Sequence, residues 1–161
     1  MTNWLTRMVW ETNGRAFTPD ELDRLTEYVE SLPERLAAAQ KLDDSQKWLS
    51  RQLTDLVAPL AAEWGLPKEP FTTDFAQSLA AVGNAMILDD HDLLRTGVLA
   101  SFTGLADALD VPRSEFGDLF AAVWTLLTRR LEPRPQELLG PYFLAVADGL
   151  GASVPRLAVA V

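Results

Sequence analysis

Few side chains in this sequence of 161 residues could do chemistry on their own. The chain has no cysteine and a single histidine, His91. These counts exclude disulfides, thiolate metal sites, thiol nucleophiles, multi-histidine metal sites and a conventional catalytic triad. The sequence therefore predicts no metal site and no catalysis by a thiol, a multi-histidine metal site or a conventional triad.

The net charge narrows the choice of partners. Fourteen Lys and Arg residues against 23 Asp and Glu residues give a net charge of −9. A field of this sign repels nucleic-acid phosphates and anionic lipid headgroups, so neither nucleic acid nor a membrane is an expected partner. Residues 1–13 have no basic flank leading into a long apolar run. No secretory signal or membrane span is therefore expected, and the sequence predicts a cytoplasmic protein.

Helices must position whatever site the chain has. Apolar residues recur at three- and four-residue steps along the whole sequence, and no stretch alternates as a β-strand would, which predicts an all-α fold. The length is that of one domain. We expect a single domain over residues 1–161, divided into an amino-terminal helical segment (1–14), a core (15–150) and an apolar tail (151–161).

Capping residues and prolines predict where several helices begin and end. The run Thr18-Pro19-Asp20-Glu21 has the pattern of a capping box with a proline in the first turn. Pro33 is expected to interrupt the helix that follows, and Gly65 to Pro70 are expected to end the next one. A further helix is then expected to start at a Thr72 or Thr73 cap. The remaining helices are expected over residues 92–109 and 114–131 and after Pro135.

Three segments of this helical sequence share the order and spacing of a known family and cover most of residues 16–150. They are 17–25 with 35–42, 74–112 closing in Leu109-Asp-Val-Pro112, and 140–150 opening with Gly140-Pro-Tyr-Phe143. These segments resemble the phycobiliproteins, the globin-like subunits that hold linear tetrapyrroles. The resemblance implies a globin-like fold with an amino-terminal helical extension, which in phycobiliproteins builds the subunit dimer. A homodimer that buries Trp4 and Trp10 is therefore expected.

The second segment and the residues just before it carry the candidate binding site. Position by position, the family's pigment-attaching cysteine falls on Phe71, the arginine two residues later on Thr73, and the next aspartate on Asp74. In the family this carboxylate accepts hydrogen bonds from the two central pyrrole nitrogens, and the resemblance implies the same role for Asp74. Because the cysteine is absent, the chain is most similar to the bilin biosynthesis-associated globins, cysteine-less phycobiliprotein relatives linked to haem oxygenases and bilin reductases.

Neighbouring side chains complete the predicted site. Phe71, Phe75 and Leu79 are expected to form an apolar wall along one helix. Propionate groups on a tetrapyrrole call for cations, and two basic residues are candidates, one just before Asp74 in the sequence and one at the start of the next expected helix. The remaining predicted binding residues are Thr73, Gln77 and Ser78, with Lys68 and Arg95 as the cations.

The sequence thus predicts non-covalent binding of a linear tetrapyrrole such as biliverdin by a carrier, store or sensor. Enzymes of bilin synthesis are implied as further partners. Three alternatives stay open. Asp74 could be an acid at a helix start, stabilised by the helix dipole. The chain could be a pigment-free interaction protein of the same fold, because Thr73 and Ala106 replace pigment-contacting residues of the family. It could also be a haem globin that uses His91, although the aspartates around His91 favour a solvated imidazole.

Overall fold

The protein is built from helices alone in the part that the computed structural model describes, residues 4–153 without the side chains of residues 47 and 68–70. The all-α prediction is confirmed, and the arrangement is consistent with a globin-like fold. Residues 154–161 of the predicted tail lie outside the described residues. None of the described helices is both long and apolar enough to cross a lipid bilayer. The elements are α1 (Trp4–Thr12), α2 (Pro19–Glu63), α3 (Lys68–Leu88), α4 (His91–Leu93), the π-helical segment η1 (Leu94–Leu99), α5 (Ala100–Leu109), α6 (Arg113–Thr128) and α7 (Pro133–Gly149).

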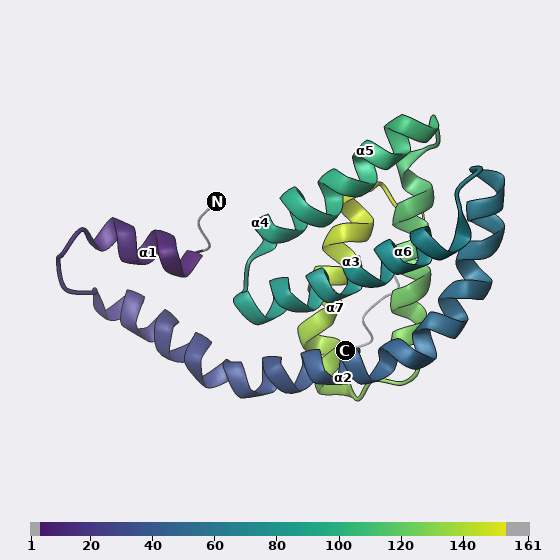
Figure 1. Ribbon diagram of the computed structural model, residues 1–161. Coiled ribbons are helices and arrows are strands. Elements are labelled where there is room, and N and C mark those ends of the chain that lie inside the picture. The colour runs from purple at the N-terminus through teal and green to yellow at the C-terminus, as the bar shows by residue number, and fades with distance from the viewer. Residues whose placement is uncertain (1–3, 154–161) are drawn as a thin grey trace.

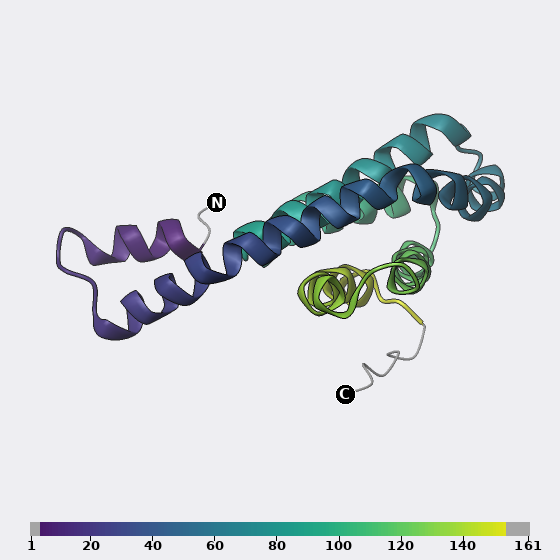
Figure 2. The same cartoon turned by 90° about the horizontal axis from the view of Figure 1, so that it is seen from below.

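The chain begins with a helical arm, formed by α1 and residues 19–36 of α2. Figures 1 and 2 show α1 folded back beside the start of α2, with α1 and the first turns of α2 projecting away from the other helices. Farther along α2, Tyr28 donates to the Ile87 carbonyl at 3.0 Å and Arg35 pairs with Asp89, so the arm joins the end of α3. The predicted capping box starts α2: the Glu21 N–H donates to Thr18 Oγ1 at 3.3 Å, and the Glu21 carboxylate accepts from the Thr18 N–H at 2.7 Å. The Trp4 ring meets the Tyr28 ring edge to face at 5.3 Å, so an aromatic contact holds α1 against α2.

α2 runs without interruption for 45 residues and contains both Pro33 and Pro59, so the predicted break at Pro33 is wrong. A proline inside a helix leaves the carbonyl four residues earlier without its usual donor. At these two prolines that carbonyl belongs to Val29 and to Asp55, which are both exposed. Water can therefore replace the missing donor. The helix bends instead of ending, as its path in Figure 1 shows.

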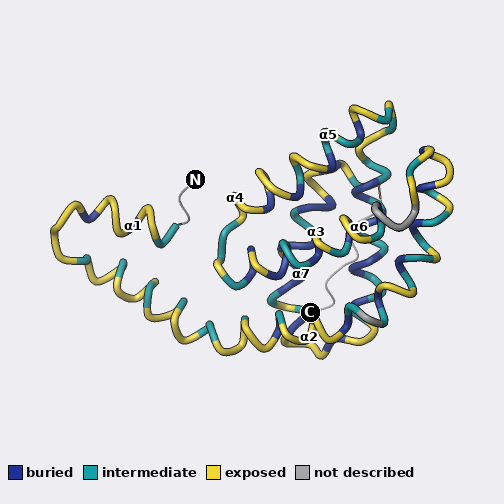
Figure 3. Tube along the Cα trace, in the orientation of Figure 1, coloured by how far each residue is buried: buried dark blue, intermediate teal, exposed yellow. Residues whose placement is uncertain are grey.

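The core lies where α2, α3, α6 and α7 pack against one another. Figure 3 shows buried positions concentrated there, while the arm is mostly exposed. Trp64 and Trp124 are 9% and 8% exposed and Trp48 packs against the same core, so three of the five tryptophans contribute to it. The largest fully buried side chains include Phe75, Phe116, Phe120, Phe143, Leu42, Leu49 and Leu53.

α3 begins at Lys68, before the predicted start at Thr72 or Thr73, and its N-cap residue Pro67 makes no side-chain hydrogen bond. Pro70 does not stop the helix because it lies in the first turn, where backbone N–H groups have no intrahelical acceptor in any case. Asp74 consequently lies in the second turn of α3. This position matters for its role, because the helix dipole acts mainly within the first turn.

The helix predicted over residues 92–109 is present but contains a π-helical turn. It consists of α4, η1 and α5 in succession. A π-helical turn inserts extra backbone into the helix and rotates the following side chains about its axis, which apolar periodicity does not reveal. The later boundaries also shift: α6 ends at Thr128 rather than near residue 131, and α7 starts at Pro133 rather than after Pro135.

Candidate functional site

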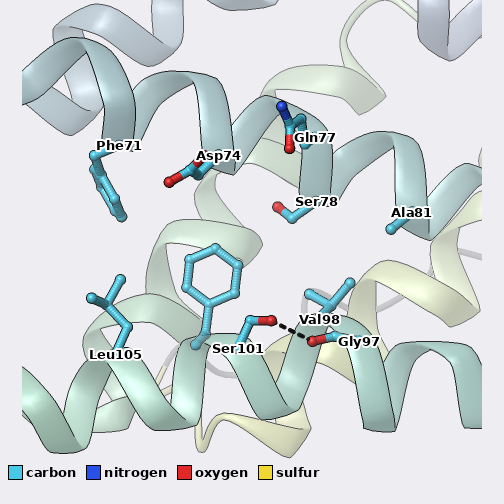
Figure 4. A pocket seen from close by; sticks show the side chains of 10 residues that line it. Phe71, Asp74, Gln77, Ser78, Ala81, Gly97, Val98, Ser101 and Leu105 are labelled. Atoms are coloured by element: carbon cyan, nitrogen blue, oxygen red, sulfur yellow. Dashed lines mark hydrogen bonds between the residues drawn. The ribbon is translucent and has the colours of Figure 1, made fainter.

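A groove between α3 and the segment formed by η1 and α5 is the candidate functional site, and Figure 4 shows its two sides. Its volume is about 480 Å³. Small-molecule sites occupy roughly 300–1,000 Å³, so the groove is large enough for an organic cofactor. α3 lines one side with Phe71, Asp74, Gln77, Ser78 and Ala81, and the other side consists of Gly97, Val98, Ser101, Phe102 and Leu105.

The groove has an apolar floor and a polar rim. Phe71, Val98 and Phe102 are 5%, 3% and 5% exposed and form the floor. Asp74 and Gln77 are exposed and lie at the rim. This combination suits a flat ligand with apolar faces and with hydrogen-bonding groups along one edge.

Asp74 is the only charged side chain among the described residues that line the groove. It has no ion pair or hydrogen bond with any other residue that the structure describes. In the second turn of α3, it has neither a capping role nor strong support from the helix dipole. The alternative of a helix-start acid is therefore not supported. Both carboxylate oxygens are available to accept hydrogen bonds from a ligand.

Most of the other polar groups of the groove offer acceptors. The Ser78 hydroxyl donates to the Phe75 carbonyl at 2.6 Å, and the Ser101 hydroxyl donates to the Gly97 carbonyl at 2.8 Å (Figure 4). Because their protons are used by the backbone, these hydroxyls offer a ligand their acceptor lone pairs. Gln77 adds one amide oxygen and an NH2 group. Apart from that NH2 group, the polar side chains that line the groove therefore suit a ligand that donates hydrogen bonds.

Aromatic side chains support the floor from below. The Phe102 ring packs against Phe75, Phe116 and Phe120, with ring centroids 5.8, 5.3 and 5.2 Å away. Rings packed at these distances hold one another in place and leave little room for rearrangement. The floor is thus preformed before any ligand arrives.

Four of the predicted binding residues meet in this groove: Phe71, Asp74, Gln77 and Ser78. Phe75 and Leu79 are instead buried beneath the floor, at 0% and 1% exposure, and do not line it. Arg95 is exposed and pairs with Asp92 at 3.2 Å, outside the lining. The side chain of Lys68 lies outside the described residues.

Two positions that carry pigment-contacting residues in phycobiliproteins, Thr73 and Ala106, do not line the groove. Thr73 is exposed and Ala106 is fully buried. Phe102, one turn before Ala106, supplies the aromatic ring on this side. The groove therefore has an aromatic ring from this helix, but the ring belongs to a position that the resemblance to phycobiliproteins did not indicate.

The whole η1–α5 side of the groove was missed by sequence reasoning. One signal was available: Gly97, Ser101 and Leu105 follow at four-residue steps, which places two small residues and an apolar one on a single helix face. The sequence alone does not reveal that this face turns toward α3. The π-helical turn at η1, which contains Gly97, also changes the register of that face.

His91 lies away from the groove. Its exposed ring stacks on Tyr142 with centroids 4.5 Å apart and an interplanar angle of 10°. Met86, whose thioether is of a kind that can also serve as an axial haem ligand, is fully buried in the core. Among the residues that the structure describes, no group of three or more His, Asp or Glu side chains is placed to hold a metal ion.

A polar cluster fixes the end of α3 against α2 and α7. Asp89, the left-handed C-cap residue of α3 with φ of 50°, accepts a hydrogen bond from the Tyr142 hydroxyl at 2.5 Å and pairs with Arg35 at 3.3 Å. Arg35 also donates to the Met86 carbonyl at 2.5 Å. Burial, together with the bond to Asp89, raises the pKa of Tyr142 to about 12. The cluster ties α3, which carries one side of the groove, to the two helices behind it.

Comparison with known proteins adds no relative from which a function could be transferred. The chain matches no protein-family model, and no curated protein is similar to it.

Proposed function

We propose that this protein binds a linear tetrapyrrole such as biliverdin, without a covalent bond, in the groove between α3 and η1–α5. The observation that carries the proposal is the free carboxylate of Asp74 above a preformed apolar floor. The proposal places the chain among the phycobiliprotein-like globins, nearest to the bilin biosynthesis-associated members, as a carrier, store or sensor of the pigment.

The chemistry of a linear tetrapyrrole matches the groups in the groove. Adjacent pyrrole N–H groups point in one direction, so a single carboxylate can accept from two of them. Such charge-assisted hydrogen bonds are roughly twice as strong as neutral ones. The conjugated rings are flat and apolar, and Phe71 and Phe102 offer aromatic surface to them. Without a cysteine, the protein would hold the pigment by these contacts alone.

The experiment is a titration of the purified protein with biliverdin, followed by absorbance. We expect a saturable red shift, and we expect Asp74→Ala to weaken binding by about tenfold or more because a charge-assisted contact is lost. The same titration on Gly97→Leu tests the location. Gly97 lines the groove, and beyond its own helix backbone a Cβ there would meet no heavy atom within 4 Å, so a side chain can start at this position and reduce the space for a ligand.

Gly104→Leu is the matched control for Gly97→Leu. Gly104 also lies on the surface of the same helical stretch with no neighbour within 4 Å of a Cβ, but it does not line the groove. Loss of binding in Gly97→Leu with normal binding in Gly104→Leu would support the proposed site. No spectral change with the unaltered protein, or equal affinity in Asp74→Ala, would overturn it.

We also propose that the protein forms a homodimer through the arm. Three large apolar side chains on α2, Leu22, Val29 and Leu36, are 47%, 53% and 54% exposed, and Trp10 on α1 is 76% exposed. An exposed apolar stripe of this kind is typical of a surface that another chain covers. Two half-buried leucines lie between the three exposed residues of α2. The five positions follow alternating three- and four-residue steps, which is the spacing of a coiled-coil seam. We call this set the arm stripe: Leu22, Leu25, Val29, Leu32 and Leu36.

The arm stripe also favours a second candidate function, a pigment-free interaction protein. A dimer that persists while biliverdin produces no spectral change would favour this candidate over the first. A haem globin is not proposed, because His91 is stacked on Tyr142 and does not line the groove.

A further inference from the structure

We infer that the groove recognises a tetrapyrrole by its N–H edge and its flat faces, and that the ligand's carboxylate side chains point out past the rim into solvent. This inference rests on the proposed bilin-binding function and specifies how the ligand is oriented. It assigns selectivity to the negative charge of the groove, with no basic side chain required for anchoring.

The charges on and near the groove carry this inference. Asp74 contributes a negative charge to the lining, and the other polar lining groups, Gln77, Ser78 and Ser101, are neutral. The nearby Arg95 is turned toward Asp92, with 69% of its side chain exposed and an ion pair at 3.2 Å. The whole chain adds a net charge of −9. A ligand carboxylate placed in the groove would therefore meet repulsion from Asp74 and from the surrounding field.

The position of Asp74 lets a single ligand orientation bring the pyrrole N–H groups to this carboxylate and keep the ligand's own carboxylates away from it. Its carboxylate lies at the exposed rim, above the floor made by Phe71 and Phe102. Rings that stack on this floor with their N–H groups toward Asp74 can project their propionate chains outward. There the carboxylates keep their hydration, which avoids the large penalty of burying an unpaired charge.

The test compares biliverdin with its dimethyl ester, using the full chain, one co-solvent and the same absorbance titration. The ester keeps the rings and N–H groups but removes both negative charges. We expect the ester to bind as tightly as the diacid or about two- to fivefold more tightly, as expected from weak repulsion across water. Raising the salt concentration from about 0.01 M to about 1 M shortens the Debye length about tenfold. It should therefore bring the two affinities together.

Two variants locate the charge effect. Asp74→Asn keeps the shape of the side chain and one acceptor oxygen but removes the charge. The ratio of the ester affinity to the diacid affinity should therefore fall toward one. Lys68→Gln removes the basic residue that lies three positions before Phe71. We expect it to leave the ratio of the two affinities within about twofold of the unaltered protein, since no carboxylate anchor is involved.

The outcomes separate this inference from the function on which it rests. Tighter binding of the diacid than of the ester, weakening of the diacid relative to the ester by salt, or a selective loss of diacid binding in Lys68→Gln would each overturn the inference while leaving bilin binding intact. Failure of both ligands to bind would overturn the proposed function and this inference with it.

Discussion

Replacing Tyr142 by Phe removes one hydroxyl from the point where α2, α3 and α7 meet. The Tyr142 side chain is 5% exposed, and its hydroxyl donates to Asp89 at 2.5 Å. Hydrogen bonds to charged groups contribute about 1.5–3 kcal/mol. The Asp89 side chain is 41% exposed and keeps its ion pair with Arg35, so water can replace part of the lost bond. We therefore expect the free energy of unfolding to fall by about 1.5 kcal/mol, or about 3–6 °C in Tm.

The pH dependence of stability provides an independent measurement of the same contact. Tyr142 has a pKa of about 12 in the folded protein against an ordinary value of 10.0. A group whose pKa is raised by folding stabilises the fold fully below its unfolded pKa, and this contribution is lost as the pH rises from 10 toward 12. Two pH units correspond to at most about 2.7 kcal/mol. Tyr142→Phe should remove this alkaline loss, whereas Tyr28, whose pKa burial also raises, remains in both proteins.

A double-mutant cycle with Asp89→Asn measures how much the negative charge strengthens this contact, because Asn keeps one acceptor oxygen for the Tyr142 hydroxyl. Asn is suited to this position because it tolerates the left-handed backbone at φ of 50° better than most residues. Chemical denaturation of the four proteins near pH 7 should give a coupling energy of about 1 kcal/mol. A coupling energy below about 0.5 kcal/mol, the scatter expected of independent sites, would refute the reasoning.

Three further predictions concern packing, assembly and the ligand. Gly117→Ala should destabilise the fold by about 1–3 kcal/mol, because its Cβ would lie 2.9 Å from the Ala147 carbonyl, whereas Gly104→Ala should stabilise it by about 0.5–1 kcal/mol in the same denaturation assay. Val29→Lys should convert the proposed dimer to a monomer in sedimentation measurements, while Glu30→Lys on the neighbouring face should not, and an unchanged dimer in Val29→Lys would exclude the arm stripe as the interface. After denaturation of the pigment-loaded protein, the tetrapyrrole should separate intact from a chain of unchanged mass, and a pigment that stays attached would contradict non-covalent binding.

The sequence predicted the class of fold because helical periodicity is a local property that most of the chain repeats. The sequence-based prediction of a break at Pro33 failed. The carbonyl that loses its usual donor there belongs to Val29, which is exposed, and the helix continues. Sequence reasoning failed again at the start of α3, where Pro70 lies in the one turn that tolerates proline. Both errors arise because the effect of a proline depends on its position in the folded helix as well as on its identity.

The candidate site was predicted on one side only. Residues of α3 share one helix, so their spacing is enough to place Phe71, Asp74 and Ser78 on related faces. The opposite side depends on packing between helices distant in the sequence and on the π-helical turn at η1. Phe102 lines the groove for both of these reasons, and neither leaves a clear trace in the spacing of apolar residues.

α2 passes from the arm into the core with no loop between them. Its 45 residues correspond to a contour of about 68 Å at 1.5 Å per residue. In the proposed dimer, two copies joined at the arm would thus hold their grooves at a defined distance and angle, as a helical spacer does. Each residue adds about 100° of rotation to a helix, so one alanine inserted between the arm stripe and Leu42 would turn the interface relative to the groove and would also part Arg35 from Asp89.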